Sequence, residues 1–169
     1  MREHGSISLI PSAQYLRMST EQQHLSLEMQ AAAIRRYAQD HHFVVVKSYE
    51  DAGKSGLLLK HRDGLMSLLQ DVVAGNRSYR AILVYDVSRW GRFQDTDEAA
   101  HYEFICRQSG APVYYCAETF NNDGSTPSAI MKTLKRVMAA EYSREQSERL
   151  YGAKRILTLQ GFSAGSHAG

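Results

Sequence analysis

The feature of this sequence that most constrains its fold is a repeated alternation of short apolar runs with longer segments of helical periodicity. A short strand is predicted at residues 13–18, and apolar runs suited to buried strands occupy residues 43–46, 81–85 and 112–115. Between these runs, apolar residues recur three and four positions apart, as they do on one face of a helix. Strands that alternate with helices predict an α/β protein with a mostly parallel β-sheet flanked by helices on both faces.

The expected helices have recognisable ends. Ser26 directly precedes the first helical pattern, and Gly75 follows the last apolar residues of the second. A third helix is predicted to begin near Asp95, because Glu98 follows three residues later as in a capping box, and to run to Arg107. These signals support the alternation of strands and helices.

One unusually long helix is predicted over residues 125–160, with no strand after it. Its first half carries an apolar stripe that includes Ile130, Leu134, Val137 and Met138, whereas its second half is strongly charged. We expect the first half to dock on the domain or on a partner, and a solvated C-terminal helix is the simpler alternative. The chain thus divides into a core at residues 1–124, the long helix at residues 125–160 and a glycine-rich linker at residues 161–169.

Composition narrows the classes of function. The net charge of +2 is too small to identify a nucleic-acid binder, so the positions of the arginines must decide that question. No apolar run approaches the roughly 18 residues of a membrane span, so we expect no membrane association and a cytoplasmic location. The sequence contains no glycine-rich nucleotide-binding loop and no spacing typical of metal ligands, so we expect no cofactor and no metal. Cys106 and Cys116 fit reduced structural thiols.

Polar clusters follow three of the predicted strands, at residues 17–23, 51–56 and 86–92, where open α/β sheets bind their ligands. Taken alone, Ser19 is more typical of a helix cap than of a nucleophile, and a single arginine is more typical of a surface ion pair. Arg17, Arg89 and Arg92 are expected together at neighbouring strand ends, where they would repel one another unless an anion bound among them. Guanidinium groups match phosphate oxygens, so the group predicts a phosphate site.

Six motifs resemble the catalytic domain of the serine site-specific DNA recombinases, the resolvase/invertase family, and most closely the large serine recombinases. They occur in the order and spacing of that family, at residues 15–23, 26–30, 51–56, 62–65, 88–92 and 138–144. The resemblance implies a resolvase-like fold in which Ser19 attacks a DNA phosphodiester, forming a 5′-phosphoserine bond and freeing a 3′-hydroxyl. One phosphodiester is exchanged for another, so rejoining needs neither ATP nor a metal.

The same resemblance implies roles for individual residues. The implied catalytic set is Ser19, Arg17, Arg89 and Arg92. The residues implied to hold or support the DNA phosphate are Arg62, Gln23, Gln30, Asp51 and Asp86. A serine hydroxyl must lose a proton to attack, and we hypothesise that proton transfer uses the arginine network or a nearby carboxylate, of which Asp86 is the best placed by sequence. Small resolvases usually carry aspartate immediately before the first arginine of the third motif, whereas this sequence has Ser88.

The implied partners are double-stranded DNA and further copies of the chain, as a homodimer that forms a tetramer in the synaptic complex. The long helix would pair two protomers through its apolar stripe, and burial of that stripe against the sheet is an equally plausible alternative. We expect a truncated chain without DNA-recognition domains, so sequence-specific binding should be weak. The sequence does not distinguish integration, transposition and inversion.

Two other functions are compatible with the pattern. A nuclease or phosphatase would use Ser19 but hydrolyse the intermediate, and trapped protein–DNA adducts would separate it from a recombinase. A non-catalytic DNA-binding or assembly module derived from a recombinase would use Ser19 only as a helix cap. The combination of Ser19 with clustered arginines argues against the second alternative, because such a module has no evident need for a hydroxyl beside them.

Overall fold

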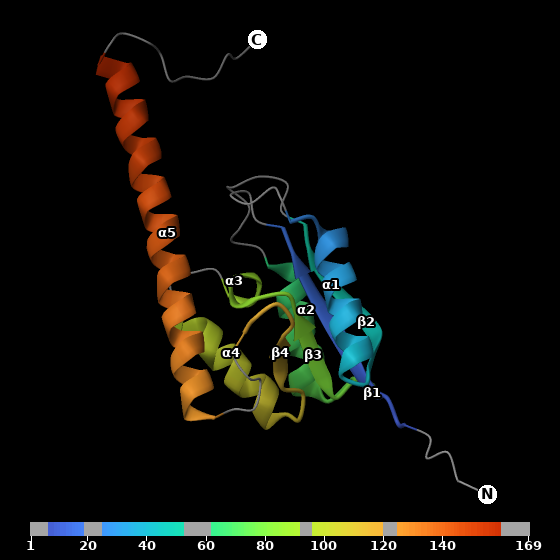
Figure 1. Ribbon diagram of the computed structural model, residues 1–169. Helices are drawn as coiled ribbons and strands as arrows, with labels where there is room; N and C mark the ends of the chain where they lie inside the picture. Colours follow the sequence, from blue (N-terminus) through green and yellow to red (C-terminus); the bar gives the residue numbers. More distant parts are fainter. Residues whose placement is uncertain (1–6, 19–24, 53–61, 92–95, 120–124, 160–169) are drawn as a thin grey trace, which may run out of the picture.

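The computed structural model describes residues 7–18, 25–52, 62–91, 96–119 and 125–159. Their elements follow one another in the order shown in Figure 1: β1 (Ile10–Arg17), α1 (Leu27–Asp40), β2 (Phe43–Asp51), α2 (Asp63–Ala74), β3 (Ala81–Val84), α3 (Val87–Trp90), α4 (Thr96–Gln108), β4 (Val113–Tyr115) and α5 (Thr126–Leu159). The α/β class and the long C-terminal helix are therefore confirmed. No helix in the described part of the chain is long and apolar enough to cross a membrane.

The sheet has the strand order β2-β1-β3-β4, and every pair of neighbours runs parallel. β1 lies at the centre, where Tyr15 is in register with Val84 of β3. The carboxyl ends of β1 and β3 are thus side by side. β2 continues to Asp51, well beyond its apolar run. Its second half can be polar because β2 is an edge strand and this half is largely exposed.

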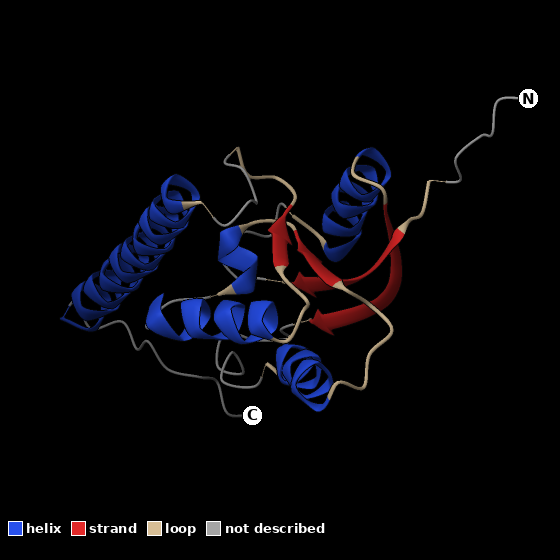
Figure 2. Ribbon diagram, turned by 90° about the horizontal axis from the view of Figure 1, so that it is seen from below, coloured by secondary structure: helices blue, strands red, loops and turns tan. Residues whose placement is uncertain are grey.

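Helices cover both faces of the sheet (Figure 2). α1 packs on one face, where Ile34 and Ala38 meet Leu16, Phe43 and Leu83. α2, α3 and α4 contribute to a larger apolar cluster on the other face. The two clusters draw on alternate residues of β1, as expected for a strand buried on both sides.

Local signals set most of the helix ends. The Ser26 hydroxyl oxygen accepts a hydrogen bond from the backbone N–H of Met29, which confirms Ser26 as the cap of α1. Gly75 ends α2 in the left-handed conformation, with φ of 70°. Asp95 lies outside the described residues. The sequence pattern does not predict α3, because four residues are too few to show helical periodicity.

α5 lies outside the core, along α3 and α4 (Figure 1), and its contacts invert the usual arrangement of an amphipathic helix. Ser128, Lys132 and Arg136 are buried. The stripe of Ile130, Leu134, Val137 and Met138 is 49% to 62% exposed. Burial of this stripe against the sheet, one of the two sequence-based alternatives, is therefore wrong. The physical reason is that the surface under α5 is polar.

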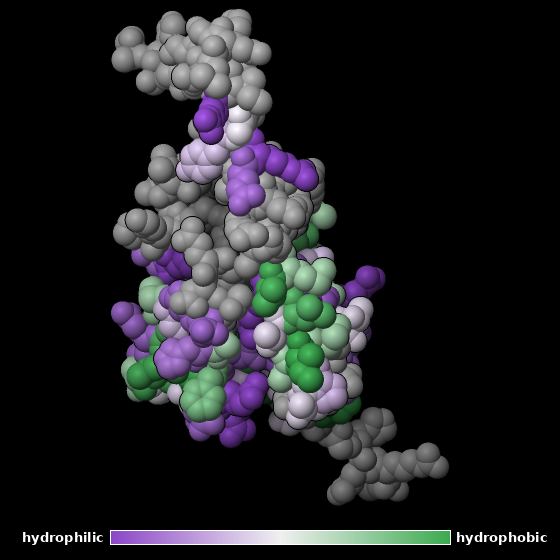
Figure 3. Space-filling model, turned by 90° about the vertical axis from the view of Figure 1, so that its left-hand side faces the viewer, coloured by the Kyte–Doolittle hydropathy of each residue, from purple (hydrophilic) through white to green (hydrophobic). Residues whose placement is uncertain are grey.

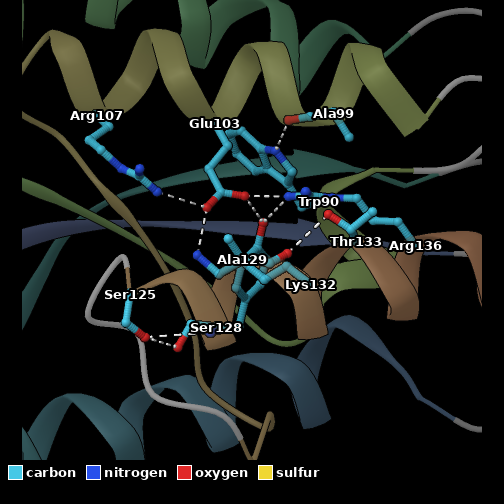
Figure 4. A network of polar contacts seen from close by, with 11 residues as sticks. Trp90, Ala99, Glu103, Arg107, Ser125, Ser128, Ala129, Lys132, Thr133 and Arg136 are labelled. Carbon is cyan, nitrogen blue, oxygen red and sulfur yellow. Dashed lines mark hydrogen bonds and ion pairs between the residues drawn. The ribbon is translucent and has the colours of Figure 1, made fainter.

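That polar surface is centred on Glu103 of α4 (Figure 4). Its carboxylate accepts hydrogen bonds from Lys132 Nζ at 2.7 Å, from the Tyr115 hydroxyl at 2.9 Å and from Arg136 Nη2. Burial opposes ionisation of Glu103, but the hydrogen bond and charge of Lys132 and the charge of Arg136 outweigh it and lower the pKa of the carboxyl. α5 is thus held on the core by buried charges.

Candidate active site

The register of β1 and β3 brings Arg17 to the beginning of α3. Tyr15 is paired with Val84, so the residues two positions further on are Arg17 and Asp86, and Asp86 is the cap of α3. The turn of α3 then carries Arg89 over the end of β1. Arg17 Nε donates a hydrogen bond to the Arg89 carbonyl at 3.1 Å, and Arg89 Nη1 donates to the Arg17 carbonyl at 3.2 Å. Both arginines are buried, with exposed fractions of 2% and 1%.

The carbonyl oxygens of α3 are the acceptors that hold the arginines. Arg17 also donates through Nη2 to the Ser88 carbonyl. Arg62, at the start of α2, donates through Nη2 to the Trp90 carbonyl and, at 3.5 Å, to that of Arg89. The last carbonyls of a helix have no partner within it and carry partial negative charge, so guanidinium donors suit them. Arg17 and Arg62 therefore converge on α3, the short helix that carries Arg89.

Tyr15 fixes Arg62 from the other side. Arg62 lies over the ring of Tyr15, and its Nε and Nη2 donate to the phenol oxygen at 3.3 and 2.9 Å. The same phenol donates to Asp51 Oδ2 at 2.7 Å. Burial raises the pKa of Tyr15 well above its usual value, although the charge of Arg62 opposes this, so the phenol keeps its proton. Tyr15 therefore links Arg62 to Asp51.

Asp51 caps the beginning of α2. Its Oδ1 accepts a hydrogen bond from the Gly64 N–H at 2.8 Å, and its Oδ2 accepts one from the Leu65 N–H at 3.1 Å. A Cβ on Gly64 would lie 2.5 Å from the Glu50 carbonyl oxygen, so only glycine lets α2 approach β2 this closely. The position of Arg62 in the site depends on this approach.

Gln30 of α1 is fully buried and bonded to the main chain of Arg17. Its Oε1 accepts from the Arg17 N–H at 3.2 Å, and its Nε2 donates to the Arg17 carbonyl at 2.9 Å and to the Leu25 carbonyl at 3.2 Å. The side-chain amide thus bonds both the N–H and the carbonyl of Arg17, as the main chain of a neighbouring strand would. In this structure Gln30 fixes the backbone from which Arg17 extends.

Asp86 holds the first turn of α3. Its Oδ1 accepts hydrogen bonds from the Arg89 N–H at 3.0 Å and from the Ser88 hydroxyl at 2.6 Å. Ser88 therefore contacts Asp86 through its side chain and Arg17 through its carbonyl. Asp86 lies within one helical turn of the arginine pair.

The structure brings together six of the nine residues that the sequence singles out: Arg17, Gln30, Asp51, Arg62, Asp86 and Arg89. Ser19, Gln23 and Arg92 lie outside the described residues. Sequence reasoning gives no separate role to Tyr15, although the two-residue spacing places it on the same face of β1 as Arg17. It also misses the α3 carbonyls, which no side-chain pattern reveals.

The geometry describes a cationic site at the carboxyl edge of a parallel sheet. Three guanidinium groups share this edge with the carboxylates of Asp51 and Asp86, and neutral carbonyl and phenol oxygens set the direction of each cation. Fixed, permanently charged donors suit an anion with several oxygens, and they need no reorganisation when negative charge develops on it. A phosphate group has that chemistry.

Three solved structures share this fold. A resolvase family site-specific recombinase from Streptococcus pneumoniae is 22% identical, covers 86% of this chain and 98% of its own, and has a TM-score of 0.61. The N-terminal catalytic domain of TP901-1 integrase is 23% identical, with 80% and 98% covered and a TM-score of 0.58. The C-terminal catalytic domain of ISC1926 TnpA, an IS607-like serine recombinase, is 21% identical, with 88% and 99% covered and a TM-score of 0.55.

At these identities the solved structures show a common fold, and the family is shown by the sequence match. The family described as "Resolvase, N terminal domain" matches residues 12–161, which is most of the chain. The protein therefore belongs to the resolvase family. No curated protein sequence matches it. The family and fold that the sequence motifs predict are confirmed.

Proposed function

We propose that this chain is the catalytic domain of a serine site-specific recombinase that cleaves and rejoins DNA through a transient 5′-phosphoserine bond at Ser19. Membership of the resolvase family supports site-specific DNA recombination in general. The proposed chemistry at Ser19 rests on one observation, which is that Arg17, Arg62 and Arg89 lie together at the end of β1. Arg17 is two residues before Ser19 in the sequence.

In the proposed reaction, the Ser19 oxygen attacks a phosphorus atom of the DNA backbone. A bond forms between that oxygen and phosphorus, the bond from phosphorus to the 3′-oxygen breaks, and the 3′-oxygen leaves as a hydroxyl. The serine proton passes to a nearby base, for which Asp86 is the candidate, and a proton reaches the leaving 3′-oxygen through the arginine network, so that the step balances. Rejoining reverses these steps with a new 3′-hydroxyl, so it consumes neither ATP nor water, and the arginines stabilise the charge on the five-coordinate phosphorus.

The proposed assembly is a homodimer on double-stranded DNA, with two dimers forming the tetramer of a synaptic complex. Figure 3 faces the side of the molecule along which α5 runs and shows hydrophobic side chains gathered over its first half. These are the exposed Ile130, Leu134, Val137 and Met138. A contiguous apolar stripe of this kind is typical of an association surface, and a second copy of α5 would cover it.

The experiment uses the full-length protein with the DNA of its own att-like or element-end site, in buffer containing a metal chelator. Wild type should give an adduct that survives denaturation and carries the 5′ end of the DNA. Ser19→Ala should give none, and the control Ser48→Ala, on the exposed part of β2, should behave as wild type. An adduct that persists in Ser19→Ala, or wild-type DNA released as a hydrolysed end, would overturn the proposal. No adduct on DNA that is bound and synapsed would favour the non-catalytic alternative.

A further inference from the structure

We propose that Glu118 is a positioning residue, through which the seating of α5 on the core sets the geometry of Arg17 and Arg89. Glu118 lies in the segment after β4, and its carboxylate joins two elements. Oε1 accepts a hydrogen bond from the Val87 N–H of α3 at 3.2 Å, and Oε2 forms an ion pair with Lys135 of α5. Because the inference concerns how the proposed DNA-cleaving site is regulated, it rests on the proposed function.

The first link runs from Glu118 to α3. α3 is a single turn, closed by main-chain hydrogen bonds from Arg89 and Trp90 to the Asp86 carbonyl and from Gly91 to that of Val87. A helix this short is not stable by itself, so its orientation depends on contacts from outside. At its beginning, Asp86 accepts from the Arg89 N–H and Glu118 accepts from the Val87 N–H. Two carboxylates from different strand ends therefore hold one short helix. Loss of either acceptor would leave a backbone donor of α3 without its present partner.

The second link runs from α3 to the arginines. The carbonyls of Ser88 and Arg89 accept the hydrogen bonds of the Arg17 guanidinium, and Arg89 itself extends from α3. A rotation or displacement of α3 therefore moves both the acceptors that orient Arg17 and the backbone that carries Arg89. Because phosphoryl transfer depends on the direction of such donors, small movements of α3 translate into changes in rate.

The third link runs from Glu118 to α5. The Glu118 side chain is 6% exposed, whereas that of Lys135 is 36% exposed, so the ion pair lies at the margin of the core. Lys132 and Arg136 hold the neighbouring turns of α5 on Glu103. Lys135 therefore moves with the whole helix. The other side of the same helix carries the exposed apolar stripe, so a second copy bound there acts on a helix that is attached to Glu118.

A merely structural ion pair makes a different prediction. It would contribute to the free energy of unfolding, and its removal would leave the arginine pair unchanged in the folded protein. The link proposed here requires the local geometry of α3 to change when Lys135 is replaced, even where global stability is kept. Lys47 with Asp71, on the far edge of the sheet, is a matched ion pair that does not touch α3.

The test compares Lys135→Met, Lys135→Arg and the control Lys47→Met in the 169-residue chain. NMR signals of the Arg17 and Arg89 Nε–H groups and hydrogen exchange at the Val87 amide report the site, and Trp90, the single tryptophan, reports α3 by fluorescence. We expect Lys135→Met to shift the Arg17 and Arg89 signals, to speed Val87 exchange about tenfold and to change Trp90 emission. Lys135→Arg should restore all three, and Lys47→Met should alter none. Glu118→Gln, which keeps the acceptor but loses the charge, should resemble Lys135→Met.

Unchanged arginine signals and unchanged Val87 exchange in Lys135→Met, beyond what Lys47→Met shows, would overturn the link. The adduct assay with full-length protein gives a second readout, in which the rate of adduct formation should fall about tenfold in Lys135→Met and recover in Lys135→Arg. An equal rate in Lys135→Met and wild type would overturn the link while leaving the proposed function standing. If wild type forms no adduct at all, the proposed function fails, and the spectra alone decide whether Glu118 couples α5 to the arginines.

Discussion

Arg17 and Arg89 hold each other through their main chains. Arg17 Nε donates to the Arg89 carbonyl at 3.1 Å, and Arg89 Nη1 donates to the Arg17 carbonyl at 3.2 Å, although the two residues lie at the ends of different structural elements. Each side chain thus orients the backbone from which the other extends. Two guanidinium groups are thus held in the folded core, each by a main-chain carbonyl of the other residue.

This arrangement predicts strong energetic coupling between the two residues. Arg17→Lys and Arg89→Lys each keep the charge but lose the planar donors, and each should lower the free energy of unfolding by about 1.5–3 kcal/mol. The double variant should lose less than the sum, because either change alone breaks the reciprocal pair. Urea unfolding of the four proteins measures this. Additive losses would contradict mutual support.

The variant Asp86→Asn tests whether Asp86 only caps α3 or also accepts the serine proton in the proposed reaction. Asparagine is as good a helix cap as aspartate, and its Oδ1 can accept from the Ser88 hydroxyl and the Arg89 N–H as Asp86 does. The free energy of unfolding should therefore change by less than about 0.5 kcal/mol. If Asp86 takes the serine proton, the rate of adduct formation should nevertheless fall by about a hundredfold or more. An unchanged rate would remove Asp86 from the chemistry and leave it as the cap of α3.

Local patterns in the sequence predict much of this fold. Ser26 and Gly75 end helices for reasons contained in one or two residues, and the apolar runs identify the strands. The motifs also predict which polar residues gather at the strand ends. Of these, the described part of the chain brings Arg17, Arg62 and Arg89 together.

The features that escape prediction depend on tertiary contacts. Tyr15 is part of an apolar strand pattern, and its link between Arg62 and Asp51 exists only once α2 has packed on β2. α5 departs from expectation for a related reason. An apolar stripe normally marks the buried face of a helix. Here Lys132 and Arg136 form buried ion pairs with Glu103, so the opposite, apolar face of α5 is exposed.

The exposed stripe of α5 predicts association through that face. Leu134→Glu should leave the free energy of unfolding of the monomer within about 0.5 kcal/mol of wild type, because Leu134 is 49% exposed. It should weaken dimer formation at least tenfold, since one charged side chain would be buried on each side of a two-fold contact. Sedimentation over a range of protein concentrations measures the proportions of monomer and dimer. A wild type that stays monomeric at high micromolar concentration would mean that this face alone does not pair the chains.

The buried Glu103 predicts a dependence of stability on pH. Its pKa is lowered in the folded state, so its contribution is complete above the pKa of an unfolded glutamate, about 4.3, and is lost as the pH falls through the folded value. At pH 7, Glu103→Gln should cost about 3–5 kcal/mol, because Lys132 and Arg136 lose their buried partner.

The difference between wild type and Glu103→Gln should shrink in acid, because protonated Glu103 is as neutral as glutamine. Urea unfolding at a series of pH values below about 5 checks this. Asp71→Asn, on the more exposed ion pair with Lys47, serves as the control and should cost less than about 1 kcal/mol at pH 7. A Glu103→Gln loss that stays constant down to acid unfolding would mean that Glu103 acts through packing and not through charge.

The two cysteines predict slow thiol chemistry in the folded protein. Burial raises the pKa of Cys106 to about 12, and the nearby charge of Glu103 adds to this; burial likewise raises the pKa of Cys116 to about 12. Because the thiolate is the reactive form, both should react with iodoacetamide at pH 8 roughly a thousandfold more slowly than an exposed cysteine. Cys106 should be the slower, since it is fully buried whereas Cys116 is partly exposed. Mass spectrometry over time measures each rate, with the urea-unfolded chain as the reference. Rapid labelling of Cys106 in the native protein would show that α4 opens away from β4, where the buried charges on Glu103 are expected to hold the two together.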